Sequence, residues 1–332
     1  MKNDELIKKL NSRIMTKRQI QEELQRQTGN DSVALSSHID VKINSNILLF
    51  DLPDPCGNMQ DDKSAFEGWI LPIKALIPSV ERVELKWDPT KGPMKVEHYN
   101  RFLYRVIKFG EMYDWFEVAD HNLQKELDRF REEWENPVVI NYPRGPKRPT
   151  SSEKKYEDII ESLFVKEYPH LLTQKTGATY INQQLPVGVF KREIGRYHRF
   201  FTGQKSAIDL WGVDEHGETL HIFELKYNNK GVGIISELFF YLCVMAEVFQ
   251  KVPPKICYPP STQKNKYRGF EHLKEKRFPN IHGYFLTNVL HSLVDQDKVM
   301  GLFNQGLARL GTISVDTLLY TYEKETKKIS WK

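Results

Sequence analysis

Residues 205–226 read Lys-Ser-Ala-Ile-Asp-Leu-Trp-Gly-Val-Asp-Glu-His-Gly-Glu-Thr-Leu-His-Ile-Phe-Glu-Leu-Lys, two short apolar runs on either side of a polar turn. This pattern predicts a β-hairpin. Side chains two apart on a strand share a face, so Glu224 and Lys226 should point the same way. With the turn centred near 215–216, Asp209 should lie diagonal to Glu224 across the hairpin. We therefore expect an aspartate, a glutamate and a lysine to converge on one patch of a sheet.

These residue types suit hydrolysis of a phosphodiester bond with the help of a bound cation. Mg²⁺ prefers oxygen ligands and keeps several waters, so Asp209 and Glu224 would suffice to hold it. Such an ion polarises a phosphate and lowers the pKa of a bound water. Lys226 would orient that water or stabilise charge on the phosphate. The alternative is that Asp209 ends a strand by turn chemistry and that Glu-x-Lys is a solvated strand face.

The order of these residues resembles the core of the PD-(D/E)xK nuclease superfamily. In that superfamily an acid on the second core strand is followed by a hairpin and by acid-x-Lys on the third strand, as in Ala207 to Lys226 here. The resemblance covers residues 153–250. Ile208 replaces the proline before the first acid, a family position that is often not proline.

The resemblance implies an α/β fold of the restriction-endonuclease type, a mixed sheet flanked by helices. It also implies Mg²⁺ as cofactor, with Mn²⁺ as a substitute. Asp209, Glu224 and the backbone carbonyl of Leu225 would be the metal ligands, and Lys226 would act on the water.

Two flanking helices extend the resemblance. Family members carry an acid on the helix before the sheet, and Glu157 within 153–164 fits that position, with Glu161 as second choice. After the hairpin, Glu237 and Tyr241 lie four apart on the helix expected over 234–249, hence on one face. They resemble a Gln-x-x-x-Tyr element that helps to position the lysine or the nucleic acid. The alternatives are a surface glutamate on the first helix and core packing on the second.

Composition limits the classes of protein to which this chain can belong. The chain has 332 residues, 40% of them hydrophobic, and a net charge of +4, which suits a globular protein of two domains. The charged start predicts no signal peptide, and the most apolar run is short for a membrane span. Three cysteines without metal-ligand spacing predict neither zinc nor a disulfide framework, so we expect a cytoplasmic protein without membrane contact.

Basic residues cluster before the hairpin, among the aromatic residues 190, 197, 200 and 201. Cations interleaved with aromatic rings suit a phosphate backbone with bases stacked nearby. A second basic run lies within 264–277. A solvated loop is the alternative for both. The first run predicts contacts to nucleic acid from Lys191, Arg192, Arg196, Arg199 and Lys205, to which the resemblance adds Tyr241.

The domain organisation follows from one proline-rich basic stretch, 141–152, which we interpret as a linker. Residues 1–140 should form an α+β accessory domain that could recognise sequence, with strand-like runs at 39–53, 66–75 and 80–88. Residues 153–332 should form the nuclease-like domain. Later apolar runs at 281–287 and 313–322 should extend its sheet.

The expected function is that of a metal-dependent nuclease, a hydrolase that cuts DNA rather than RNA, with a restriction or phage-defence role by analogy alone. A homodimer would suit cleavage of both strands, although the sequence identifies no interface. Two alternatives stay open: a catalytically inactive nucleic-acid-binding protein with a nuclease-like fold, and an α/β protein with a chance match.

Overall fold

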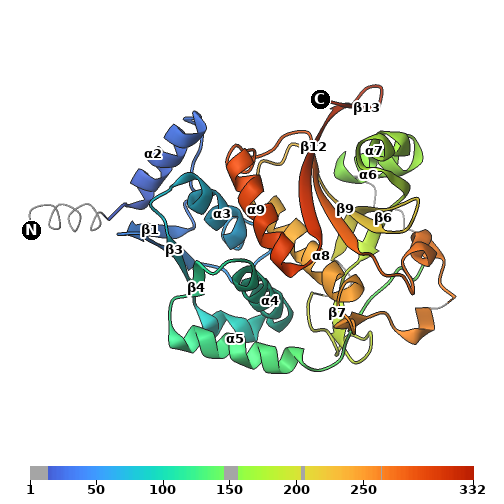
Figure 1. The fold of residues 1–332 in the computed structure, drawn as a ribbon, viewed down its shortest axis with the longest axis horizontal. Helices are drawn as coiled ribbons and strands as arrows, with labels where there is room; N and C mark the ends of the chain where they lie inside the picture. Colours follow the sequence, from blue (N-terminus) through green and yellow to red (C-terminus); the bar gives the residue numbers. More distant parts are fainter. Residues whose placement is uncertain (1–13, 146–155, 203–205, 263) are drawn as a thin grey trace, which may run out of the picture. The chain divides into compact units, whose positions relative to one another are not determined.

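The computed structural model describes residues 14–145, 156–202, 206–262 and 264–332 (Figure 1). They form two compact units. The first comprises the described residues up to Glu133 with Gly231–Ser236 and His291–Gly306, and the second comprises Trp134–Lys230, Glu237–Leu290 and Leu307–Lys332. The sequence places a single boundary at 141–152, of which 146–152 lie outside the described residues. Here residues 134–140 group with the second unit, and two later segments of the chain complete the first.

The first unit contains a four-stranded sheet in the order β1-β2-β3-β4, in which β1 and β2 pair antiparallel and the other neighbours pair parallel. Burial alternates along β1 and β3, so one face of this sheet is packed and the other is exposed. The N-terminal half is therefore mixed α and β. Its elements are α2 (Lys17–Thr28), β1 (Asp40–Asn44), β2 (Ile47–Leu52), α3 (Phe66–Leu76), β3 (Arg82–Trp87), η1 (Pro89–Met94), α4 (Val96–Met112), β4 (Phe116–Val118) and α5 (His121–Trp134).

The strand expected at 66–75 is wrong, because these residues form helix α3. Nearly every residue from Phe66 to Ile73 is buried. A helix that is apolar around most of its circumference shows no clear helical period, and a short run of this kind cannot be distinguished from a buried strand by periodicity.

Helix α3 also buries an ion pair inside the first unit. Arg105 of α4 lies 3.1 Å from Glu67, and the two side chains are 3% and 0% exposed. The Ser236 hydroxyl donates to the other Glu67 oxygen at 2.7 Å, and Arg105 donates to the Ser64 carbonyl at 2.8 Å. A buried charge is tolerated only when it is paired and hydrogen-bonded, as here.

The second unit is built on a six-stranded mixed sheet in the order β13-β12-β11-β9-β8-β6. The strands β12, β11 and β9 run parallel to their neighbours within this group, and the other pairs are antiparallel. The expected extension of the sheet by later strands is confirmed. Its strands are β6 (Ala178–Pro186), β8 (Ala207–Asp214), β9 (Thr219–Lys226), β11 (Asn280–Thr287), β12 (Ile313–Glu323) and β13 (Lys328–Trp331).

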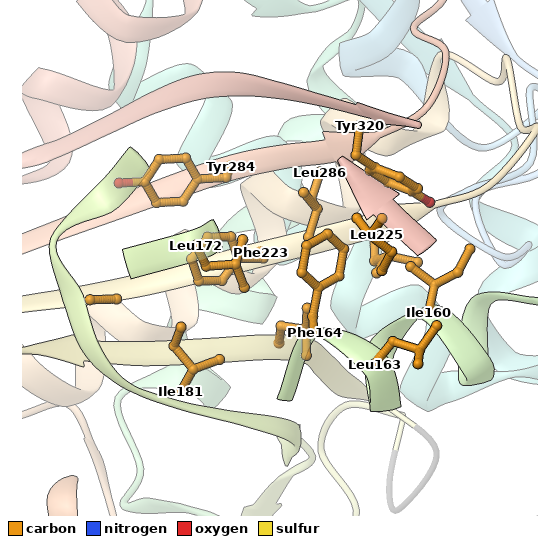
Figure 2. Close-up of a cluster of buried hydrophobic side chains, with 13 residues drawn as sticks. Ile160, Leu163, Phe164, Leu172, Ile181, Phe223, Leu225, Tyr284, Leu286 and Tyr320 are labelled. Atoms are coloured by element: carbon orange, nitrogen blue, oxygen red, sulfur yellow. The ribbon is translucent and has the colours of Figure 1, made fainter. Parts of the chain in front are cut away.

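Helices cover both faces of this sheet. On one face, α6 (Tyr156–Lys166) and α7 (Pro169–Thr176) bury a hydrophobic core against the strands (Figure 2). On the other face, the close approach of Leu242 to Gly283 of β11 brings α8 (Gly233–Phe249) against the sheet. A mixed sheet with helices on both faces confirms the α/β class. The core residues labelled in Figure 2 include Ile160, Leu163, Phe164, Leu172, Phe223, Leu225, Leu286 and Tyr320.

A smaller sheet and short helices complete the second unit. The sheet has the order β10-β5-β7 and comprises β10 (Ile256–Cys257), β5 (Val138–Ile140) and β7 (Val189–Lys191). The remaining elements are η2 (Pro260–Thr262), η3 (Tyr267–His272) and α9 (Asp297–Leu310), the last of which starts in the first unit. Among the described residues, no helix combines the length and apolar composition that crossing a membrane requires.

Candidate active site

The predicted hairpin is present as β8 and β9, but its register differs from the expected one. The antiparallel ladder runs from Val213↔Leu220 to Leu210↔Phe223, which places Asp209 directly opposite Glu224. The expectation of a diagonal pair is wrong because the turn lies one residue later along the chain. Gly217 adopts φ +69°, and Asp214 accepts backbone hydrogen bonds from Gly217 and Glu218.

The hydrogen-bonded ladder between β8 and β9 ends beside Asp209 and Glu224. No ladder pair is formed beyond Leu210↔Phe223, and the Leu225 N–H donates instead to Asp209 Oδ2 at 3.0 Å. The N–H and C=O of one strand residue point to the same side, so the Leu225 carbonyl is directed toward the strand that carries Asp209. Asp209, Glu224 and the Leu225 carbonyl, the three expected metal ligands, therefore lie together where the ladder ends. We call this place the opening between β8 and β9.

Lys226 lies between two carboxylates. Its ammonium donates to Glu224 Oε1 and, at 3.0 Å, to Glu237 Oε2 of α8. All three side chains are buried, with 7%, 1% and 9% of their surfaces exposed. The structure thus brings together four of the five residues expected to be catalytic: Asp209, Glu224, Lys226 and Glu237.

The electrostatics of this cluster are dominated by burial and by an excess of negative charge. Burial, opposed by Lys226 and reinforced by neighbouring carboxylates, raises the pKa of Asp209 to about 8. Burial and the charges of Asp209 and Glu237 raise the pKa of Glu224 well above its ordinary value. Burial alone would lower the pKa of Lys226, but the three carboxylates raise it well above its usual range.

Three carboxylates therefore surround one ammonium, and one of their oxygens has no partner. Glu224 Oε2 is buried without a hydrogen bond. A buried carboxylate oxygen without a partner is costly unless a proton or a cation satisfies it. Within the described ranges, no group of three or more His, Cys, Asp and Glu side chains is arranged to hold a metal ion. The cluster can supply two carboxylates and a carbonyl, the small set with which Mg²⁺ is commonly held.

Of the two glutamates on α6, Glu161 lies nearer to the cluster. Its charge raises the pKa of Asp209, and both its carboxylate oxygens accept hydrogen bonds from Gln184 Nε2, at 3.0 and 2.9 Å. Glu157, the first choice from sequence, accepts instead from the Tyr227 backbone N–H at 3.2 Å. Glu157 is thus placed at the end of β9 rather than beside Asp209.

Gln184 is a residue that the sequence gives no reason to choose. Its backbone has φ +57° in β6, a conformation that residues other than glycine rarely adopt. The register of β6 and β8 places it opposite Asp209. Arg268 donates to its backbone carbonyl at 2.7 Å, which ties one residue of the second basic run to the site's framework.

Tyr241 does not reach the surface at which nucleic acid was expected to contact it. It is buried, and its hydroxyl donates to Glu237 Oε1 at 3.1 Å. Tyr241 therefore orients Glu237, which in turn contacts Lys226. From the opposite face of the sheet, the Tyr320 hydroxyl donates to the Lys226 carbonyl at 2.9 Å and fixes the backbone that carries the lysine.

The first basic run forms an exposed loop between β7 and β8. Lys191, Arg192, Arg196 and Arg199 are exposed, and Lys205 lies outside the described residues. Of the interleaved aromatic residues, Tyr197 is 90% exposed, whereas the phenylalanines at 190, 200 and 201 are buried in the second unit. The loop can contact phosphates, and stacking of bases on the phenylalanines is excluded by their burial.

Comparisons with known proteins add no further constraint: no protein-family model, no curated protein and no solved structure matches this chain.

The raised pKa of Asp209 gives a testable dependence of stability on pH. In EDTA, this carboxyl is protonated in the folded protein up to about pH 8 but ionised above about pH 4 in the unfolded chain. Its stabilising contribution is complete below that lower pH and is lost as the pH rises through about 8. We expect the melting temperature to fall more steeply between about pH 4 and 8 for the native chain than for Asp209→Asn. Parallel curves for the two proteins would contradict the raised pKa.

Proposed function

We propose that this protein is a metal-dependent phosphodiesterase of the PD-(D/E)xK type, a nuclease. The observation that carries the proposal is the cluster of three carboxylates and one lysine at the opening between β8 and β9. In a purely structural role, each buried carboxylate would have its own cation or donors. Here the negative charge exceeds the positive charge, as a site for a cation requires.

The residues fit Mg²⁺ or Mn²⁺. Asp209 and Glu224 would hold the ion, with the Leu225 carbonyl as a further oxygen ligand, and substrate phosphate and water would complete the octahedron. When bound, the ion would polarise the phosphate and acidify a water. Glu224 Oε2 is the oxygen best suited to the ion, since no donor among the described residues hydrogen-bonds to it.

The other residues of the cluster would act on the attacking water and on the charge of the transition state. Lys226 would orient the attacking water and stabilise charge that develops on the phosphate. Glu237, itself held by Tyr241, accepts a second hydrogen bond from the ammonium. Glu161 would support the Asp209 side of the site, because Gln184 holds its carboxylate in place.

The substrate we propose is nucleic acid, with DNA preferred to RNA. The exposed cations of the loop between β7 and β8 support nucleic acid as the substrate, and the preference for DNA rests on the family resemblance alone. That loop leads into β8 at Ser206, three residues before Asp209, where the Ser206 carbonyl accepts a hydrogen bond from the Val187 N–H. At about 3.3 Å per strand residue, this point lies on the order of 10 Å from Asp209 along the strand.

Incubation of the purified chain with supercoiled plasmid, linear duplex, single-stranded DNA and RNA tests the proposal. We expect cleavage with Mg²⁺ or Mn²⁺ and none with EDTA, because the acidified water and the polarised phosphate both depend on the ion. Nicking of the plasmid would identify internal cleavage. Cleavage that persists in EDTA would refute the metal-dependent mechanism. Binding without cleavage of every substrate would favour an inactive nucleic-acid-binding protein.

The loop cations make a separate prediction about affinity. Replacing Arg196 and Arg199 together with alanine should weaken binding to DNA and reduce the slope of log K against log salt by about one unit for each phosphate that is no longer neutralised. Binding would be measured in Ca²⁺ over a range of salt. The control is the double replacement of Arg129 and Arg131 with alanine, which removes the same charge from α5. Equal effects of both variants would show that net charge, not this loop, binds the substrate.

A further inference from the structure

Three tyrosine rings gather beside the end of β9, where the sequence shows no motif. Tyr156 opens α6, Tyr227 directly follows Lys226, and Tyr322 lies near the end of β12. Their ring centroids are 5.4 Å apart for Tyr156 and Tyr227, 5.7 Å for Tyr227 and Tyr322, and 6.4 Å for Tyr156 and Tyr322. We call these three residues the tyrosine platform.

One side of the platform is packed and another is open. Tyr227 and Tyr322 are partly buried against the core between α6 and the sheet, which holds their rings in place. Tyr156 is 45% exposed. Rings held by a core but open to solvent are already ordered before a ligand arrives, so stacking on them costs little conformational entropy.

The hairpin beside the platform is basic. Lys324 Nζ lies 4.4 Å from the centroid of the Tyr156 ring. This lysine belongs to the hairpin of β12 and β13, where residues 323–332 contain Lys324, Lys327, Lys328 and Lys332 but only Glu323 and Glu325 as acids. Aromatic rings beside an excess of cations are the combination that binds single-stranded nucleic acids, the rings stacking on bases and the cations contacting phosphates.

The platform is also close to the proposed active site. Tyr227 is the chain neighbour of Lys226, so its ring lies on the opposite face of β9 from the ammonium. Its N–H donates to Glu157, the residue after Tyr156. Glu161, whose charge acts on Asp209, lies five residues after Tyr156 on the same helix. At 1.5 Å per residue this is about 7.5 Å along the helix axis. A strand that leaves the site around the end of β9 would therefore meet the rings.

We propose that the tyrosine platform stacks unpaired bases next to the site of cleavage, so that the substrate is a nucleic acid with a single-stranded or unwound segment. This inference rests on the proposed function, because the platform gains its role from its position beside Lys226. Stacking of this kind accepts any base, since each base has an aromatic face. The platform would thus favour single-stranded over double-stranded nucleic acid and would not read the base sequence.

The test compares two probes that differ only in their bases: a short oligothymidylate and the same strand made of abasic nucleotides. Binding would be measured in Ca²⁺ at fixed salt. Tyr156→Ala should weaken binding of the oligothymidylate by about tenfold and leave binding of the abasic strand unchanged. Tyr156→Phe keeps the ring and should bind both probes as the native chain does. Tyr168→Ala serves as the control, because Tyr168 is also a partly buried tyrosine packed against the same core but does not belong to the platform.

Two results would overturn the inference: unchanged binding of the oligothymidylate by Tyr156→Ala, or equally weakened binding of both probes, which would indicate a change in charge or folding. These outcomes are separate from failure of the proposed function. A native chain that cuts DNA while Tyr156→Ala binds the oligothymidylate normally would refute the platform alone. A native chain that binds through Tyr156 but cuts nothing would refute the nuclease and with it the platform's role in cleavage.

Discussion

Asp209→Asn will lose cleavage activity, by a factor on the order of 10³ or more, while remaining folded. Asparagine keeps an oxygen that can accept the Leu225 N–H but removes the charge that would hold the ion. In EDTA, asparagine is neutral in this buried position without binding a proton, whereas the Asp209 carboxyl is held protonated there up to about pH 8. The variant should therefore be at least as stable as the native chain in EDTA above about pH 7. Initial rates of plasmid nicking and thermal melting would be measured on the same preparations.

Asp214→Asn is the matched control for this experiment. Asp214 lies on the same strand as Asp209 but at the turn, where its carboxylate accepts the Glu218 N–H at 2.8 Å. It should retain cleavage within a few-fold and lose about 1 kcal/mol of stability with the weakened turn. Full activity of Asp209→Asn, or equal losses of activity in both variants, would show that the cluster is not the site of reaction.

Glu67→Ala will destabilise the first unit by about 3–5 kcal/mol, because it leaves the Arg105 guanidinium buried without its counter-charge. The remaining hydrogen bond from Arg105 to the Ser64 carbonyl does not neutralise the charge. Urea unfolding followed by tryptophan fluorescence would report the shift in midpoint. Since the chain has two units, each transition would be fitted separately.

Two further variants separate the charge from the packing at this pair. Ser236→Ala removes one donor to Glu67 and leaves the ion pair, so it should cost about 1 kcal/mol. The double replacement of Glu67 with leucine and Arg105 with methionine should recover most of the stability, because an apolar pair of similar volume avoids the cost of desolvation. A loss of stability below about 1 kcal/mol in Glu67→Ala would show that water reaches the pair and screens it.

The sequence predicts the hairpin and most of the cluster because short-range rules control them. Alternation along β9 places Glu224 and Lys226 on one face whatever the rest of the fold is. The spacing of Glu237 and Tyr241 similarly predicts that they contact each other on α8, and they do. The prediction is wrong for the register of β8 and β9, because that register depends on the detailed conformation of the turn.

Contacts that depend on tertiary structure could not be predicted. Glu157 and Glu161 lie one turn apart on α6, and only the packing of that helix decides which one acts on Asp209. The role of Gln184 could not be predicted from the sequence, because it follows from a rare backbone conformation in β6. Helix α3 is mistaken for a strand because its burial on nearly all sides removes the periodicity on which prediction depends.

The turn between β8 and β9 has a consequence for how this chain can change in length. Surface turns usually accept inserted or deleted residues with little penalty. Here the turn also sets which residue of β8 faces Glu224, and a slip of one residue would direct Asp209 to the opposite face of the sheet. Residues 214–219 therefore act as a spacer of fixed length, so that an exposed loop outside the proposed site is as restricted as the carboxylates whose alignment it maintains.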